Sequence, residues 1–211
     1  MVRIVLVTGG CRSGKSAYAQ CLAESLPPRR LFVATCPVTD EEILRRIQQH
    51  RQARQDRGWE TVEEQSDLTD VFRGHGQYNV LLVDCVTLWI NNLMYHAQYE
   101  GRALTEADVT QECRQVLDAV QACRGTVIFV TNEVGLGVVP ENAQARRYRD
   151  LVGRANQVLA ARADTVTLLC CGIPLHLKDA DKTTPPSPPG TARSVVPFPE
   201  GEGSLKEETL S

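Results

Sequence analysis

The chain has 211 residues, a formal net charge of −3 at pH 7 and 42% hydrophobic residues. This length predicts one large domain with a sizeable core rather than two domains. A slightly acidic chain gives no electrostatic reason to expect nucleic-acid binding. The first apolar run has only about six residues, which is too short for a membrane span. Because no cleavage-like segment follows it, we expect a cytoplasmic protein without a signal peptide or anchor.

Residues 2–18 carry the strongest local signal. An apolar run over 2–7 is typical of a buried parallel strand. It leads into a segment that fits G-x-x-x-x-G-K-[ST], a loop whose backbone N–H groups surround phosphate oxygens. Lys15 would supply a charge to the outer phosphates and Ser16 a hydroxyl for a magnesium ion. The alternative is an ordinary glycine turn, but the helical pattern that follows favours phosphate binding. The predicted nucleotide-binding residues are Gly9, Gly10, Cys11, Arg12, Ser13, Gly14, Lys15 and Ser16.

Two more strands are predicted to end beside this loop. Residues 31–35 form a short strand whose end, Ala34-Thr35-Cys36, would lie at the sheet edge where ligands bind. Residues 80–83 form a buried run that ends at Asp84, and an acid in that position usually holds magnesium. Ser16 and Asp84 are therefore the predicted Mg²⁺ ligands. Between these strands, the pattern predicts a helix over 40–54 and an edge strand over 59–64.

The second half continues the alternation of helix and strand. Helices are predicted over 86–100, from Thr105 towards Gly125 and over 142–163, with strands over 126–130 and 165–171. The polar loop 131–137 is either a substrate-binding loop or an ordinary connection. Arg146 and Arg149 would hold phosphate or a neighbouring subunit, or else lie on a solvated face. The alternation predicts a mainly parallel α/β sheet of the P-loop NTPase type, flanked by helices.

The cysteines and the C-terminal composition complete the local analysis. The eight cysteines contain no C-x-x-C pair and no histidines at zinc-ligand spacing, which favours free buried thiols over a disulfide framework. Cys11 is either an oxidation-sensitive position or a tolerated small residue. The domain is predicted to span 1–178. Residues 179–211 are rich in Pro and Gly, which predicts a disordered tail without a catalytic role.

Five blocks of this sequence resemble the bifunctional adenosylcobinamide kinase / adenosylcobinamide-phosphate guanylyltransferase family of cobalamin biosynthesis. They occur in the family's order and together span residues 1–178. The first is common to many NTPases, whereas the combination of the last two is highly specific. The blocks are TGGCRSGKS at 8–16, HRxxR at 50–54 followed by Trp59, LLVDCVTLW at 81–89, TNEVGLGVVP at 131–140, and ARRYRDLVGRANQVLAARAD with CGIPLHLK at 145–178.

This resemblance implies two successive reactions. The first moves the γ-phosphate of ATP or GTP onto the aminopropanol hydroxyl of adenosylcobinamide. The second transfers GMP from a guanylylated His50 to adenosylcobinamide phosphate, and a neutral imidazole is suited to attack an α-phosphate. The family forms homotrimers. The residues that the resemblance adds to the nucleotide-binding set are Arg51, Gln52, Ala53, Arg54 and Glu63.

The sequence departs from the family in one region. Gln55 stands where a proline is usual, and Trp59 is nine residues past His50 rather than eight, which implies a one-residue insertion near Gly58. Two other functions stay open: a single-activity P-loop kinase for another small molecule, and a nucleotide-sensing regulatory module.

Overall fold

The computed structural model describes residues 1–37, 41, 45, 48, 52 and 54–179. Within them no helix is long and apolar enough to cross a membrane. The elements are β1 (Arg3–Gly9), α1 (Lys15–Glu24), β2 (Arg30–Ala34), β3 (Trp59–Glu63), α3 (Leu68–His75), β4 (Val80–Asp84), α4 (Val86–Tyr99), α5 (Glu106–Val120), β5 (Thr126–Val130), α6 (Ala143–Arg162), β6 (Thr165–Cys170) and β7 (Ile173–Asp179).

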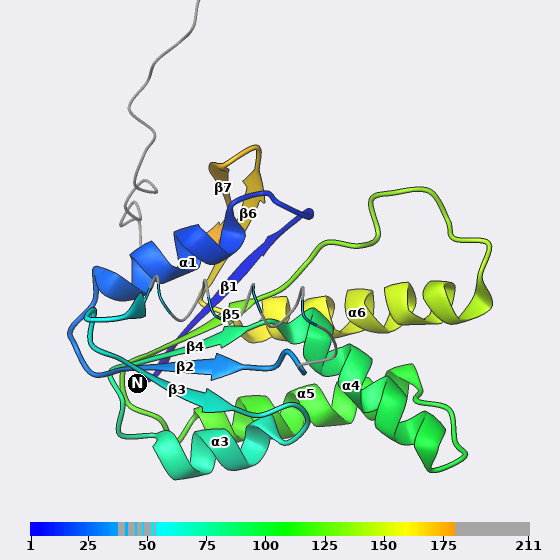
Figure 1. Cartoon of the computed structure of the whole chain (residues 1–211), viewed down its shortest axis with the longest axis horizontal. Helices are drawn as coiled ribbons and strands as arrows, with labels where there is room; N and C mark the ends of the chain where they lie inside the picture. The colour runs from blue at the N-terminus through cyan, green and yellow to red at the C-terminus, as the bar shows by residue number, and fades with distance from the viewer. Residues whose placement is uncertain (38–40, 42–44, 46–47, 49–51, 53, 180–211) are drawn as a thin grey trace, which may run out of the picture.

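These strands form one seven-stranded sheet in the order β3-β2-β4-β5-β1-β6-β7 (Figure 1). All neighbouring pairs are parallel except β6 and β7, which are antiparallel. The predicted α/β class and mainly parallel sheet are confirmed. Because all the parallel strands end at one edge, the loops that follow them gather there.

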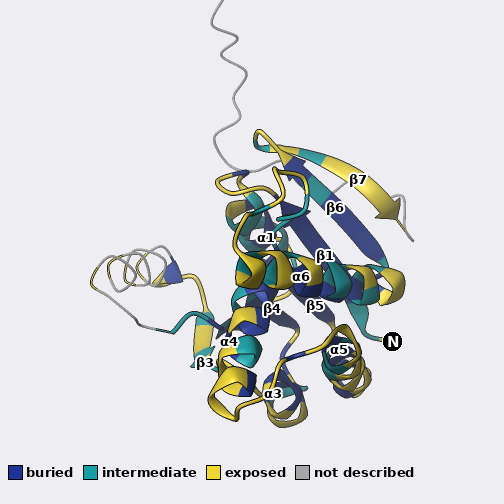
Figure 2. Ribbon diagram, turned by 90° about the vertical axis from the view of Figure 1, so that its right-hand side faces the viewer, coloured by how far each residue is buried: buried dark blue, intermediate teal, exposed yellow. Residues whose placement is uncertain are grey.

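Alternating side chains of the central strands face two separate hydrophobic layers. Ile4 and Leu6 of β1 point into the layer covered by α3, α4, α5 and α6. Val5 and Val7 point into the layer covered by α1, where Tyr18 and other α1 residues pack. Figure 2 shows the buried central strands between exposed outer surfaces, and the largely exposed edge strand β7. The continuous apolar runs seen in the sequence therefore reflect burial on both faces of the sheet.

Most predicted elements are confirmed, with small shifts at their ends. Thr105 is the N-cap of α5, where its hydroxyl accepts from the amide of Asp108 (3.2 Å), forming a capping box with the Asp108 carboxylate. The strand β7 was not among the predicted elements. Its last residue, Asp179, belongs to the sheet rather than to the predicted tail, and residues 180–211 lie outside the described residues.

None of the eight cysteines, all of which lie within the described residues, forms a disulfide, as predicted. The prediction that these thiols are buried is correct for only some of them. Cys85, Cys113 and Cys123 are buried in the core, but Cys11 is exposed in the loop after β1. Cys170 and Cys171 are also exposed, at the end of β6. The three exposed cysteines lie at or just after the carboxyl end of a strand, where the chain leaves the core.

Candidate active site

The loop between β1 and α1 is shaped by close contacts that only glycine allows. A Cβ on Gly9 would lie 2.5 Å from the carbonyl oxygen of Leu169 and 2.6 Å from Ser13 Oγ. Gly14 is the N-cap of α1 and has a φ of 89°, in the left-handed region that favours glycine. The Lys15 ammonium donates to the Gly10 carbonyl oxygen at 3.1 Å, across the loop. The predicted phosphate loop thus joins a buried strand to a helix N-terminus, a geometry suited to anions.

One row of residues crosses the sheet at its carboxyl edge. Ala34 of β2 pairs with Asp84 of β4. Asp84 pairs in turn with Val130 of β5, and Val130 pairs with Val7 of β1. Val7 lies two residues before Gly9, where the phosphate loop begins. The predicted ligand-binding end of β2 and the predicted metal-binding acid therefore share the sheet edge that carries the phosphate loop.

Asp84 and Lys15 both act electrostatically on the thiol of Cys85. Burial raises the pKa of Cys85 to about 11, the Asp84 carboxylate adds to the rise, and the positive charge of Lys15 opposes it. The lysine of the loop and the acid at the end of β4 thus both lie within electrostatic range of the Cys85 thiol. Phosphoryl transfer uses a cation and a metal-binding carboxylate, the roles predicted for Lys15 and Asp84.

Thr35 holds the end of β4 in place. Its hydroxyl donates to the Cys85 carbonyl oxygen and accepts from the Cys85 amide, both at 2.8 Å. Asn92 of α4 in turn donates to the Thr35 carbonyl oxygen at 2.9 Å. Thr35 is fully buried. The structure therefore gives Thr35, which was predicted to bind nucleotide, a positioning role for the segment that carries Asp84.

The loop after β5 runs beside the phosphate loop. The Thr131 amide donates to the Val7 carbonyl oxygen (2.9 Å), and the Glu133 amide donates to the Gly9 carbonyl oxygen (3.1 Å). Asn156 of α6 fixes the same loop, since it accepts from the Thr131 hydroxyl (2.7 Å) and donates to the Asn132 carbonyl oxygen (3.1 Å). Residues 131–133 are thus bonded directly to the strand end from which the phosphate loop starts.

Two arginines of α6 support the far part of this loop. Arg149 donates to the Gly135 carbonyl oxygen at 2.8 Å, and Arg146 donates to the carbonyl oxygens of Pro140 and Glu141. Arg149 is half-buried rather than solvated, whereas Arg146 makes its bonds from an exposed position. Arg154, further along α6, donates instead to the hydroxyl of Thr110 on α5 (2.9 Å). The loop partners of Arg146 and Arg149 could not be read from helical spacing.

The turn of the β6–β7 hairpin also contacts the phosphate loop, and the sequence analysis did not predict this contact. The Gly172 amide, at the turn between the strands, donates to the Ser13 carbonyl oxygen at 3.0 Å. Cys171 and Gly172 both have positive φ values, 52° and 79°, as a two-residue hairpin turn requires. The available signals were this turn and the alternation of Ile173, Leu175 and Leu177, which predicts a strand.

Several buried polar atoms of the site have no protein partner within the described residues. They are Thr8 Oγ1 at the end of β1, Ser13 Oγ in the phosphate loop, and Asn132 Oδ1 in the loop after β5. Buried polar atoms are normally satisfied, and exceptions often mark ligand sites. Asn132 was not among the predicted site residues, although it lies in the loop singled out as a substrate-binding candidate.

The donor types around the loop suit a hard divalent cation. The Ser16 hydroxyl and Asp84 carboxylate are oxygen ligands, which Mg²⁺ prefers, and Mg²⁺ usually completes its shell with waters and substrate phosphates. In the described part of the chain, no group of three or more His, Cys, Asp or Glu side chains could hold a metal ion alone.

Other predicted site residues lie away from the phosphate loop. Glu63 is the register partner of Ala34 on the edge strand β3, four strands from β1, which corresponds to about 19 Å across the sheet. Arg54 is buried, and its guanidinium stacks 3.5 Å from the ring centroid of Phe32. Gln52 and Arg54 line a cavity of ≈ 470 Å³ with Trp59. His50, Arg51 and Ala53 lie outside the described residues.

Comparisons with known proteins agree with the resemblance. Residues 5–177 match the family model described as cobinamide kinase / cobinamide phosphate guanyltransferase. The bifunctional adenosylcobalamin biosynthesis protein CobU of Escherichia coli (strain K12) is 38% identical over 183 residues, covering 83% of this chain and 99% of that protein. CobU of Salmonella typhimurium is 38% identical, with the same coverage. CobP of Pseudomonas aeruginosa is 39% identical, covering 82% of this chain and 96% of that protein.

Proposed function

Because this chain belongs to the cobinamide kinase / cobinamide phosphate guanyltransferase family, we propose that it phosphorylates adenosylcobinamide and then converts the product to adenosylcobinamide-GDP. The observation that carries this proposal is the family match over residues 5–177, which includes a phosphate loop with the expected geometry. ATP or GTP supplies the phosphate in the first reaction, and GTP supplies GMP in the second, within cobalamin biosynthesis.

In the kinase reaction the aminopropanol hydroxyl attacks the γ-phosphorus, and the bond from that phosphorus to the β-phosphate oxygen breaks. The loop amides and the Lys15 ammonium stabilise the charge that develops on the transferring group. The ammonium already contacts a loop oxygen, the Gly10 carbonyl at 3.1 Å, so it can exchange that acceptor for a phosphate oxygen. The unpartnered Asn132 Oδ1 accepts a hydrogen bond from the attacking hydroxyl, whose proton passes to solvent as the new O–P bond forms.

Ser16 and Asp84 are the residues that would hold Mg²⁺, which neutralises charge on the nucleotide phosphates when bound. Asp84 is kept at the sheet edge by the Thr35–Cys85 hydrogen bonds. Ser16 is in the first turn of α1, directly after Lys15. The positions of both oxygens are thus set by rigid elements rather than by loops.

In the transferase reaction a His50 ring nitrogen attacks the α-phosphorus of GTP, and pyrophosphate leaves. The phosphate of adenosylcobinamide phosphate then attacks the same phosphorus, and the P–N bond to His50 breaks. The predicted nucleotide contacts of this step are Arg51, Gln52, Ala53, Arg54 and Glu63. We place both reactions in the cytoplasm, where nucleoside triphosphates are available, and we propose the homotrimer that the resemblance implies.

Labelled nucleotides test both halves of this function. With GTP labelled at the α-phosphate, label should remain on the denatured chain, and His50→Ala should abolish it. His96→Ala, an exposed position on α4, is the matched control and should keep the label. Phosphate transfer from γ-labelled ATP to adenosylcobinamide without any protein label would indicate a single-activity kinase. Nucleotide binding without either transfer would indicate a sensing module.

A further inference from the structure

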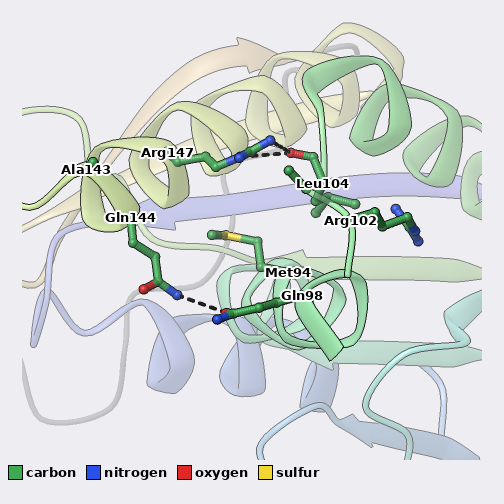
Figure 3. A pocket seen from close by; sticks show the side chains of 8 residues that line it. Met94, Gln98, Arg102, Leu104, Ala143, Gln144 and Arg147 are labelled. Atoms are coloured by element: carbon green, nitrogen blue, oxygen red, sulfur yellow. Dashed lines mark hydrogen bonds between the residues drawn. The ribbon is translucent and has the colours of Figure 1, made fainter. Parts of the chain in front are cut away.

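Two adjoining cavities lie between α4 and α6, outside the phosphate site. Their volumes are ≈ 310 and ≈ 320 Å³, and Met94, Gln98 and Gln144 line both of them. Figure 3 shows the first, with Met94 between the two helices and the Gln144 side chain directed towards Gln98. The two cavities adjoin at the hydrogen bond from Gln144 to Gln98, and together they are called here the α4–α6 cleft.

The lining of the α4–α6 cleft combines apolar and carboxamide groups. Met94, Tyr95 and Tyr148 supply apolar surface, while Asn91, Gln98 and Gln144 supply amide donors and acceptors. The two lining arginines already have partners, since Arg147 donates twice to the Leu104 carbonyl oxygen and Arg102 pairs with Glu100. This chemistry suits a ligand with apolar faces and carboxamide arms rather than an ion.

The cleft is connected to the phosphate site. Tyr148 lines the cleft, and its hydroxyl donates to the carbonyl oxygen of Thr87 (3.2 Å), three residues after Asp84. At 1.5 Å per residue, Asn91 to Gln98 lie about 8 to 18 Å along α4 from its first residue, Val86. Figure 1 shows the second half of α4 and the first half of α6 extending beyond the carboxyl ends of the strands.

We infer that the α4–α6 cleft binds the corrin ring of the substrate, with its carboxamide arms replacing the long Gln144–Gln98 hydrogen bond (3.4 Å) by bonds to both side chains. This inference rests on the proposed function. A corrin is a broad macrocycle with methyl groups and carboxamide arms on its rim, and the phosphate-accepting hydroxyl stands at the end of a further arm. A ring in the cleft therefore leaves that arm free to extend towards Asp84 and the phosphate loop.

The test is kinetic and uses the full-length protein. In Gln98→Leu/Gln144→Leu, the KM for adenosylcobinamide should rise about tenfold, because two hydrogen bonds are lost. Gln144→Trp, which fills the cleft from an exposed position, should raise it further. The KM for ATP should stay within twofold. The matched control Gln111→Leu/Gln115→Leu makes the same changes on the exposed surface of α5 and should leave both constants unchanged.

A corrinoid KM within twofold of wild type in both cleft variants would overturn the inference. So would a change in oligomeric mass, measured by light scattering, without a change in that KM, because it would assign the cleft to contacts between copies. A parallel rise in the KM values for ATP and adenosylcobinamide would also overturn it. If the wild-type protein neither binds nor phosphorylates adenosylcobinamide, the proposed function itself fails.

Discussion

The amide of Glu133 donates to the carbonyl oxygen of Gly9 at 3.1 Å, so the loop after β5 is bonded to the first glycine of the phosphate loop. Two segments more than a hundred residues apart in the sequence thus form one unit at the sheet edge. Movement of either segment displaces the other, and a residue that holds one of them contributes to the placement of both.

Gly9→Ala should lower the free energy of unfolding by about 1–3 kcal/mol, because the new Cβ overlaps two neighbouring atoms, one of which is backbone that cannot shift without disturbing β6. The overlapping atoms are the Leu169 carbonyl oxygen at 2.5 Å and Ser13 Oγ at 2.6 Å. Gly10→Ala is the matched control, since its Cβ would meet nothing within 4 Å. Urea unfolding of both variants checks this, and equal stabilities would contradict the close approach of β6.

Arg149→Met should lower kcat for phosphate transfer by about ten- to a hundredfold, because the loop that carries Asn132 loses its anchor at Gly135. Arg154→Met makes the same change about one and a half turns further along α6, where the arginine contacts α5 instead. Steady-state assays with γ-labelled ATP compare the two. A similar loss in both variants would attribute the effect to general damage to the helix.

Asp84→Asn should raise the Mg²⁺ concentration needed for half-maximal activity by about tenfold or more, because a neutral amide is a weaker ligand. Removal of Mg²⁺ with a chelator should stop both reactions. The readout is a metal titration at saturating nucleotide, with Asp70→Asn on α3 as an exposed control. An unchanged titration midpoint would remove Asp84 from the metal site.

Alkaline pH should destabilise the fold through its buried thiols. Burial raises the pKa of Cys113 to about 12 and that of Cys85 to about 11. Because the pKa is raised in the folded protein, each thiol loses its proton at a lower pH in the unfolded chain than in the folded one. The free energy of unfolding therefore keeps its full value below about pH 9. It falls as the pH rises towards 11, by up to about 1.4 kcal/mol per pH unit for each thiol. Urea unfolding across this range should show a shallower fall in Cys113→Ala, and an identical slope would refute the assignment.

Removal of residues 180–211 should leave both the unfolding free energy and kcat unchanged. The family match ends at residue 177 and the last strand ends at Asp179. Removal from Ile173 onwards, which also deletes β7, should destabilise the protein because β6 then loses its neighbour. Any loss of activity in the shorter deletion would give the tail a function.

Elements whose signal is local were predictable from the sequence. β1, β4 and β5 are continuous apolar runs because helices cover both faces of the sheet. The start of α5 was predictable because Thr105 and Asp108 satisfy each other's backbone groups. The glycines and Lys15 of the phosphate loop were also recognisable from a local signal, since all the fixed positions of the motif lie within eight consecutive residues.

Features that depend on distant partners were not predictable. The spacing of Arg146 and Arg149 on α6 did not reveal that they hold carbonyl groups in the preceding loop. The edge strand β7 has an exposed apolar side, so the expected contrast between a buried and a solvated face is missing. The role predicted for His50, which lies outside the described residues, came from the family resemblance alone, because one histidine in a helical pattern carries no signature of a nucleophile.

The direction of the β6–β7 hairpin has a practical consequence. Its turn touches Ser13, while the final residue, Asp179, pairs with Thr165 at the opposite edge of the sheet. A purification handle, a fluorescent protein or a surface linkage joined after Asp179 would therefore start from the side remote from the nucleotide. In the protein shortened to end at Asp179, immobilisation through that end should leave the phosphate-loop side accessible.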